Sequence, residues 1–521
     1  YTTLFRSEMC ASEITISLLE DDSKIPYTVR KECEQIIRKL PNFKEYLELP
    51  EYETLVRLLE KGIGIHHSGM IPILREIVEI MISKKNIKLL FATESFAIGL
   101  DCPIKTAIFT GINKFDGRSE RLLLPHEYTQ MAGRAGRRGI DTIGHVVHCN
   151  NLFNLPLKQD YSQLLLGKPQ RLVSKFRISF SLILSLIKNN KIQMNDFTAF
   201  VEHSMIFNEL NQEIATHKSI LTEKKYVYQK KKEQIVFLKT IPTICSRFNT
   251  IELAIPTTKN KKRRQLEKER DQIIIENPSC KTDCKILSEI EEFETIMREQ
   301  EEEIFYLENY ISEKVLVVCD VLKEKQFIQE MDNNYELTEL GKIAADIAEV
   351  HPLIMTQLIT HTNWFQEQTV DDIISILSIF TDVNVAKDVK EENPTSKNYA
   401  LLQHIQYVAD TYDNYNDLEN TMRINSGSQY TDALCYDMPD LVNGWCGCTS
   451  EMECKVYLQN NVAQKTISAG DFTKALLKIS TIVREIALVA EKMNQIECAH
   501  KLSQVDSKIL KYITTSQSLY I

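Results

Sequence analysis

The sequence predicts an α/β domain over the first 155 residues, followed by a mostly helical remainder that ends in a bundle. Three observations support this. Up to residue 150, short apolar stretches alternate with amphipathic ones, as in α/β sheet domains. Apolar residues at near-heptad spacing over 286–311 predict a long helix that pairs with another. After residue 351 the apolar spacing is helical.

The bulk composition limits the classes of function. A length of 521 residues gives room for roughly three or four domains. The longest apolar run, 178–187, is too short to span a bilayer, and the N-terminus shows no secretory pattern. Thirteen scattered cysteines indicate free thiols in a reducing compartment. We therefore expect an intracellular protein, nuclear or cytoplasmic, with no membrane partner.

A net charge of −10 means that a globally basic surface is absent. Any contact with nucleic acid has to come from a local patch or an interior channel.

The α/β part is predicted in chain order. A strand over 62–67 runs into a helix with Pro72 in its first turn, and a buried strand over 88–92 follows. The next strand is predicted over 106–111, and a loop or small hairpin then leads to residue 125.

The stretch 125–148 is predicted to be a helix that starts at Pro125 and is stopped by Gly139, followed by a buried strand. An apolar stripe falls at the spacing i, i+3, i+4, i+7 and comprises Tyr128, Met131, Ala132 and Ala135. A different face carries Gln130, Arg134 and Arg137, with Arg138 beside them. Guanidinium groups suit the charge that builds on a transferring phosphoryl group. A solvated arginine face remains the alternative interpretation.

Two shorter motifs also carry polar groups at the ends of predicted strands. His67, Ser68 and Gly69 lie where a strand gives way to a helix, so that backbone N–H groups there can hold a phosphate. The alternative for Ser68 is an ordinary helix N-cap.

The second motif follows the strand over 88–92. Thr93 and Glu94 come directly after it, and Gly99 and Asp101 close the next turn. A threonine hydroxyl suits a phosphate oxygen, and the Asp101 carboxylate suits a hydroxyl group. A strand-end threonine and a turn aspartate are the alternative.

Together HHSG, ATESFAIG and QMAGRAGRRG resemble, in order and spacing, the superfamily two DExH-box RNA helicases of the exosome-associated superkiller type. The resemblance implies an ATP-dependent motor that moves 3′–5′ along single-stranded RNA. It places Gln130, Arg134 and Arg137 on the ATP as catalytic groups, with Arg138, Gly99 and Asp101 also binding the nucleotide. It places His67, Ser68, Gly69, Thr93 and Glu94 on the RNA.

Neither GxxxxGK[ST] nor a DExH string occurs in the sequence. In this family both belong to the first RecA-like domain, which holds ATP and Mg²⁺. We therefore expect a C-terminal portion of such a helicase, whose partners are that first domain, single-stranded RNA and an exosome-like or other RNA-processing complex. A DNA helicase of the same superfamily, or a truncated scaffold that binds RNA without catalysis, are the alternatives.

The resemblance implies a fold class: an α/β RecA-like domain followed by a winged helix with a coiled-coil insertion and a C-terminal helical bundle. The expected boundaries are the second RecA-like domain at 1–155, winged helix at 156–205 and 313–350, helical hairpin at 206–312, and bundle with a ratchet helix at 351–521. The wing is expected to turn at Asn333–Asn334.

The insertion shows a charge pattern. Residues 217–270 hold 15 basic against 5 acidic residues, and 276–308 hold 11 acidic against 3 basic. This predicts two antiparallel arms paired by charge, with the basic run 257–265 near the tip or on a helix leading away. That run either touches RNA or a partner or is simply solvated. Cys280 and Cys284 are expected in a loop, and two thiols do not make a zinc site, so no metal site is predicted.

In the C-terminal part, the polar and acidic stretch 388–432 is expected to be a mobile surface segment. A zinc cluster is the alternative for Cys435, Cys446, Cys448 and Cys454. The resembled family has no metal there, so we expect free thiols. The stretch 470–493 resembles the family's ratchet helix, which implies that Thr473, Lys474 and Lys478 face RNA.

Overall fold

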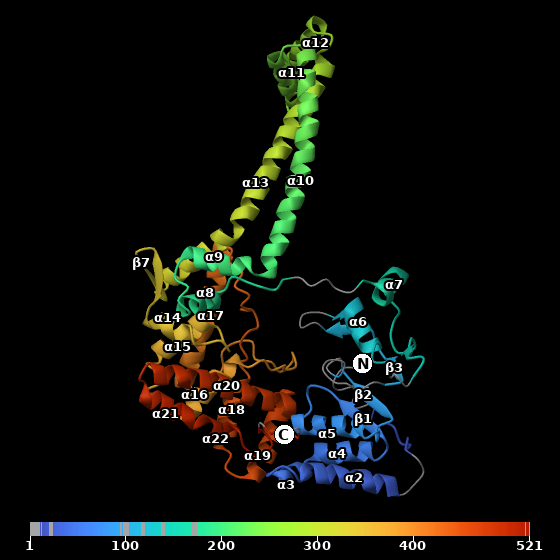
Figure 1. Cartoon of the computed structure of the whole chain (residues 1–521), viewed down its shortest axis with the longest axis vertical. Helices are drawn as coiled ribbons and strands as arrows, with labels where there is room; N and C mark the ends of the chain where they lie inside the picture. The colour runs from blue at the N-terminus through green and yellow to red at the C-terminus, as the bar shows by residue number, and fades with distance from the viewer. Residues whose placement is uncertain are drawn as a thin grey trace. The chain divides into compact units, whose positions relative to one another are not determined.

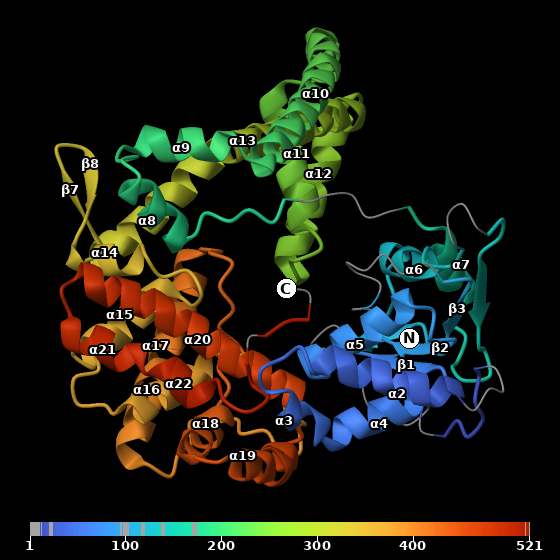
Figure 2. The same cartoon turned by 60° about the horizontal axis from the view of Figure 1, so that its bottom comes forward.

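A computed structural model describes residues 11, 13–19, 24–93, 96, 104–115, 120–136, 141–168, 174–515 and 517–519. The chain divides into two compact units (Figures 1 and 2). The first unit comprises Tyr1–Leu172, Lys342–Thr421 and Gly427–Ile521, and the second comprises Val173–Gly341 and Met422–Ser426. Over the described ranges, none of the helices combines the length and the apolar character that a membrane crossing needs.

The first unit opens with an α/β segment. Its helices are α2 Lys24–Ile37, α3 Phe43–Leu47, α4 Pro50–Leu59, α5 Pro72–Ser83, α6 Pro125–Ala132 and α7 Lys158–Leu166. Its strands are β1 Ile63–His66, β2 Leu89–Ala92, β3 Thr106–Phe109, β4 Asn113–Phe115, β5 Glu120–Leu122 and β6 His145–His148. β1 pairs with β2 and β3 with β6, both in parallel, whereas β4 and β5 form an antiparallel hairpin.

Two small cores hold this segment. α4 and α5 both pack on β1, and the inward face of α5 buries Ile73, Ile77 and Met81 at helical spacing. A second core joins β3, α6 and α7 through Phe109, Met131 and Leu164. The predicted apolar stripe of α6 packs here, since Tyr128, Ala132 and Ala135 lie against the same cluster.

The predicted end of the arginine helix was wrong. α6 stops at Ala132, seven residues before Gly139, and residues 133–136 leave the helix. The helix ends because the backbone of residues 134 and 136 forms hydrogen bonds with Ile104. The Ile104 N–H donates to Arg134 O (3.1 Å), and the Ile104 carbonyl accepts from Gly136 N (2.7 Å). Gly136 permits this turn because its φ is +92°.

The strand that follows was expected to be buried, and this was also wrong. β6 forms, but Val146 and Val147 are 39% and 45% exposed.

The second unit contains α8 Phe180–Lys188, α9 Met194–Glu202, α10 Met205–Glu233, η2 Gln234–Phe237, α11 Pro242–Ala254, α12 Asn260–Glu276, α13 Cys280–Glu324 and the hairpin β7 Ile328–Met331 with β8 Asn334–Leu337. α10 and α13 run side by side over most of their length in Figures 1 and 2. The return arm does not end near residue 312 but continues as one helix of 45 residues to Glu324.

Ion pairs between the arms show that they are antiparallel. Lys218 meets Glu308, Lys225 meets Glu301, and Lys231 meets Glu289, so that rising numbers on α10 match falling numbers on α13. Each exposed pair contributes only about 0–1 kcal/mol. The basic run falls on the exposed first turns of α12, beyond the arms.

The wing turn lies one residue earlier than predicted. Met331 pairs with Asn334, and Asp332 and Asn333 both adopt positive φ, +51° and +61°. Two left-handed residues make the tight hairpin turn whose twist matches the strands.

The C-terminal helices of the first unit are α14 Glu339–Ala344, α15 Pro352–His361, α16 Val370–Leu377, η3 Ser378–Phe380, α17 Tyr399–Met422, α18 Met438–Gly447, α19 Glu451–Tyr457, η4 Leu458–Val462, η5 Ala463–Lys465, α20 Ala469–Lys492, α21 Ile496–Ser503 and α22 Val505–Ile509. α14 itself begins in the second unit.

The expectation of a mobile segment at 388–432 was wrong, because α17 occupies its centre with a buried stripe of Leu401, Ile405, Val408, Tyr412 and Tyr415.

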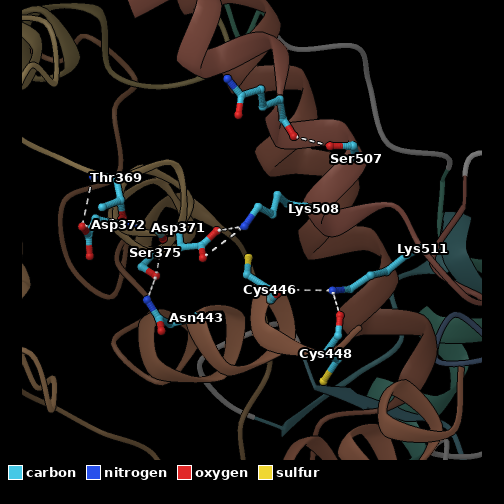
Figure 3. A network of polar contacts seen from close by, with 11 residues as sticks. Thr369, Asp371, Asp372, Ser375, Asn443, Cys446, Cys448, Ser507, Lys508 and Lys511 are labelled. Carbon is cyan, nitrogen blue, oxygen red and sulfur yellow. Dashed lines mark hydrogen bonds and ion pairs between the residues drawn. The ribbon is translucent and has the colours of Figure 1, made fainter. Parts of the chain in front are cut away.

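Polar contacts close this bundle around α16, α18 and α22 (Figure 3). Lys508 pairs with Asp371 (3.1 Å), and Lys511 donates to the carbonyl oxygen of Cys446 (3.2 Å) and to that of Cys448. Trp445, fully buried, donates its indole N–H to Ile509 O (3.0 Å). The end of the chain is thereby fixed to the middle of the bundle.

The same end of the chain reaches the α/β segment. Tyr512 O accepts a hydrogen bond from Asn42 (3.0 Å), and Glu76 accepts from Leu519 N (2.6 Å) and Ser518 (3.0 Å). Within the first unit, the bundle and the α/β segment are thus joined by hydrogen bonds in which the side chains of Asn42 and Glu76 take part. The RecA-like and winged-helix assignments, and the domain boundaries, stay predictions.

Candidate nucleic-acid and nucleotide site

The loop after β1 is the first part of the candidate site. His66 ends the strand, 3% exposed, with its Nε2 2.9 Å from Glu79 Oε1 and its ring against Phe96. Burial lowers the pKa of His66, so the ring is neutral at pH 7. His67 is also 3% exposed. The two histidines therefore anchor the loop, and Ser68 and Gly69 follow at its turn.

Thr93 lies beside this loop. It follows β2 directly, and its N–H donates to His66 O (3.2 Å), so the ends of two parallel strands meet there. The structure thus brings the predicted Thr93 and the His67–Gly69 loop to one edge. Glu94 lies outside the described residues.

Helix α20 begins against the same loop. Ser468 caps it by accepting from Asp471 N (3.0 Å), and Gly470 follows in the first turn. A methyl group placed on Gly470 would come within 2.5 Å of both Gly69 O and Met70 O. In proteins a Cβ atom essentially never lies under 3.0 Å from such an atom, so only glycine fits at position 470 without a shift of the loop or the helix.

The three predicted RNA contacts of α20 have different surroundings. Lys474 donates to Ser68 O and to Asp471 (2.9 Å), and Lys478 binds the carboxylate and the backbone oxygen of Glu349 (3.0 Å to the latter). Thr473 is fully buried, and its hydroxyl donates to Ala469 O (2.8 Å). In this conformation both lysines hold protein groups, and Thr473 lies inside the helix packing.

The arginine segment forms a separate edge. Gln130 is exposed near the end of α6, and Arg134 is half-buried just beyond it. The remaining predicted nucleotide-binding residues lie outside the described residues: Gly99, Asp101, Arg137 and Arg138.

α6 is held by its first-turn carboxylate. Glu127 accepts two hydrogen bonds from Arg121 (2.8 and 2.9 Å), one from Lys114 (3.1 Å) and one from Leu124 N (2.8 Å). The Arg121 guanidinium is the main reason why the pKa of Glu127 falls to about 2. The helix that presents Gln130 therefore starts from a fixed, ionised cap.

The described residues fit ATP only in part. Gln130 and Arg134 offer an amide and a guanidinium of the kind that phosphate oxygens accept. The other residues predicted to bind the nucleotide lie outside the described ranges.

A cavity of ≈ 800 Å³ lies behind the loop, between α4, α5 and the start of α20. His67, Gly69, Ser468 and Ala469 line one side of it, and leucine and isoleucine side chains line much of the rest. This mostly apolar lining does not suit a phosphate backbone, so we place no RNA in it.

Two residues of this site were missed from the sequence. Gly470 stood at the first position of the predicted helix 470–493, where the sequence gave no sign that another segment comes close. Glu349 lies at the end of a predicted domain, far from Lys478 in sequence, and no pattern joins the two.

Comparisons with known proteins match parts of this chain to one family model and to several helicases. A family model, the DSHCT (NUC185) domain, matches residues 334–516. The DExH-box ATP-dependent RNA helicase DExH11 of Arabidopsis thaliana is 39% identical over 190 residues, which is 36% of this chain and 14% of the relative. Superkiller complex protein 2 of Homo sapiens is 44% identical over 150 residues, 29% of this chain and 12% of the relative. Exosome RNA helicase MTR4 of Homo sapiens is 43% identical over 150 residues, 28% and 14% respectively.

The relatives that these comparisons match are DExH-box RNA helicases. More closely, segments of this chain are similar to helicases of the Ski2/Mtr4 type, and residues 334–516 match the DSHCT domain, so the resemblance predicted from the three motifs is confirmed. The matched segments span only 12% to 14% of the length of the three relatives quoted.

Proposed function

We propose that this chain forms the second RecA-like domain, winged helix and helical bundle of an ATP-dependent RNA helicase that moves 3′–5′ along single-stranded RNA. The single observation that carries the proposal is the packing of α20 on the His67–Gly69 loop. In the proposed motor, the loop binds phosphates of the RNA and α20 lies along the strand. Their direct contact then couples a movement of the one to the other.

In this proposal, ATP draws a first RecA-like domain against the edge that carries Gln130 and Arg134. Arg134 and Arg137 then stabilise the charge that develops on the γ-phosphate, and Gln130 orients the nucleotide. Mg²⁺, held by the first domain, supplies charge neutralisation at the β- and γ-phosphates.

On the RNA side, the backbone N–H groups around Ser68 and Gly69 and the hydroxyl of Thr93 bind phosphate oxygens. Opening after hydrolysis shifts the strand past Lys474 and Lys478. The lysines have to exchange Ser68 O and Glu349 for phosphate oxygens when RNA arrives. Contacts of this kind read the backbone and not the bases, so binding is independent of sequence and falls with salt.

We also propose an RNA-processing complex as the partner. The support is that one relative is named for the exosome and another for the superkiller complex.

The test is a strand-separation assay with the complete natural protein. Three duplexes of equal length are compared: RNA with a 3′ overhang, RNA with a 5′ overhang, and DNA with a 3′ overhang. We expect ATP-dependent separation of the first only, and none with a non-hydrolysable ATP analogue. A strong preference for DNA supports the DNA helicase, and RNA binding without ATP turnover supports the scaffold; either result overturns the proposal.

A further inference from the structure

Three cysteine thiols converge beyond the two arms of the helical insertion. Cys245 comes from α11, and Cys280 and Cys284 come from the first turns of α13. Cys280 and Cys284 had been expected in a loop, and their place on a helix explains the convergence, since residues four apart share one face. The third thiol comes from 35 residues upstream, so sequence spacing did not reveal it.

The three sulfur atoms stand at distances that suit one metal ion. All lie within 4.8 Å of one another, and the Sγ atoms of Cys280 and Cys284 are 3.5 Å apart. A thiolate–metal bond of about 2.3 Å places the sulfurs of one site about 3.8–4.0 Å apart. The observed sulfur–sulfur separations, from 3.5 Å to at most 4.8 Å, include that value. Small side-chain rotations would therefore bring all three sulfurs to bonding distance of one ion. In the part of the chain that the structure describes, this is the one group of three His, Cys, Asp or Glu ligands that comes together.

The three thiols also make up much of the buried core between α11, α12 and the first turns of α13, which we call the tip of the insertion. The three thiols are 0%, 1% and 3% exposed, and Phe248 is the fourth buried member of their cluster. α12 fully buries none of its residues, but its Ile273 and Ile274 pack against the cluster from partly buried positions. A segment of about 50 residues with so few buried apolar side chains belongs to the size class that metals or disulfides usually stabilise.

The surrounding backbone is already fixed. Asp283, 7% exposed, accepts hydrogen bonds from the N–H groups of Lys239 (3.2 Å) and Thr240 (2.9 Å), just before α11. Cys284 Sγ also lies 3.7 Å from Cys245 O. α11 and α13 are therefore held together independently of any ion, and the three sulfurs face one another in a prepared arrangement.

We propose that Cys245, Cys280 and Cys284 bind one soft, closed-shell metal ion, Zn²⁺ or Cu⁺, that stabilises the tip of the insertion. Thiolates select these ions over hard cations such as Mg²⁺. On binding, three S–H bonds break, three metal–sulfur bonds form, and three protons pass to solvent, with no change of oxidation state. The proposal is independent of the helicase function.

The experiment uses the whole source protein, stripped of metal under anaerobic, reducing conditions. Zn²⁺ is titrated against a chromophoric chelator and Cu⁺ against a copper(I)-specific chelator, and Co²⁺ replaces Zn²⁺ as a spectroscopic probe. We expect one equivalent of metal and thiolate-to-cobalt charge-transfer absorption. The tighter of the two titrations identifies the ion.

Two variants make the test specific. Replacing Cys245, Cys280 and Cys284 by alanine should abolish the bound equivalent and the cobalt absorption. Replacing Cys435, Cys446 and Cys454, three buried thiols of the bundle, should leave both unchanged. The single variant Cys245→Ala keeps the test valid if the triple variant misfolds, and should weaken binding at least about tenfold, since it removes one of three bonds.

A second readout does not need the variants to fold. Trypsin cleavage within the basic first turns of α12 should become several-fold faster when a chelator removes the metal. The proposal is overturned if the wild-type protein binds no equivalent or if the triple tip variant retains it. It is also overturned if the tip thiols form a disulfide in source protein isolated without reductant.

Discussion

The Cα of Gly470 faces the carbonyl oxygen of Gly69 so closely that a methyl group on Gly470 would lie 2.5 Å from that oxygen. One glycine starts the proposed ratchet helix, and the other belongs to the loop of the proposed phosphate site. Because neither glycine has a side chain, the contact joins backbone to backbone.

Gly470→Ala should therefore uncouple the loop from α20. The added methyl group meets two carbonyl oxygens that cannot rotate away, and overpacking of this kind costs about 1–3 kcal/mol. We expect a lower melting temperature and RNA-stimulated ATP hydrolysis reduced several-fold in the complete protein. Thermal unfolding and steady-state ATPase assays measure the two effects.

Gly447→Ala is the matched control, because a methyl group there meets nothing within 4 Å. It should leave both quantities at the wild-type level. Equal behaviour of the two variants would show that the contact has no role in coupling.

Lys478→Ala should weaken RNA binding whatever the RNA sequence. Removal of one phosphate contact lowers affinity about 5- to 10-fold at low salt and reduces the salt slope by about 1. Because Glu349 holds Lys478 in the absence of RNA, Glu349→Gln should act in the opposite direction and tighten binding. Fluorescence anisotropy over a salt series measures both.

The control is Lys492→Ala, in the last turn of the same helix, where the lysine pairs with Asp346. Loss of affinity there equal to that of Lys478→Ala would mean that the effect comes from total charge and not from position.

Glu127→Gln should destabilise α6 at neutral pH. The native pKa of Glu127 is about 2, below its ordinary value of 4.5, because Arg121 and Lys114 bind the charged form. A lowered pKa stabilises the fold above pH 4.5, and this stabilisation is lost as pH falls from 4.5 toward 2. We expect a loss of about 2 kcal/mol at pH 7 that shrinks across that window.

Hydrogen exchange of the α6 amides at several pH values follows this difference. Glu120→Gln, at an exposed position on β5, serves as the control. A constant difference between Glu127→Gln and wild type from pH 7 to pH 3 would contradict the assignment of the charge.

Features that depend on residues close together in the sequence were predicted correctly more often than features that depend on long-range packing. The helix over 470–493 was predicted from its resemblance to the family's ratchet helix, and α20 covers Ala469–Lys492. The end of α6 was predicted wrongly because backbone hydrogen bonds between Ile104 and residues 134 and 136 end the helix. Local helix propensity does not reveal such a contact. α17 was taken for a mobile segment because its average polarity hid a stripe of large apolar side chains.

The candidate site divides in the same way. The motifs placed His67–Gly69 and Thr93 each at the end of a predicted strand, and the structure shows that these two strands are neighbours. The partners of Lys474 and Lys478, and the meeting of Cys245 with Cys280, depend on chain packing over long sequence distances. The RNA and ATP roles themselves remain predictions.

The most direct test of the central claim is RNA-stimulated ATP hydrolysis by the complete source protein carrying Arg137→Ala. An arginine that stabilises the transition state contributes about 10³-fold or more, so turnover should fall by about that factor while RNA affinity stays within about twofold. Arg38→Ala, at the exposed end of α2, should match wild type. Wild-type turnover in Arg137→Ala would contradict the assignment of this segment to the ATP site.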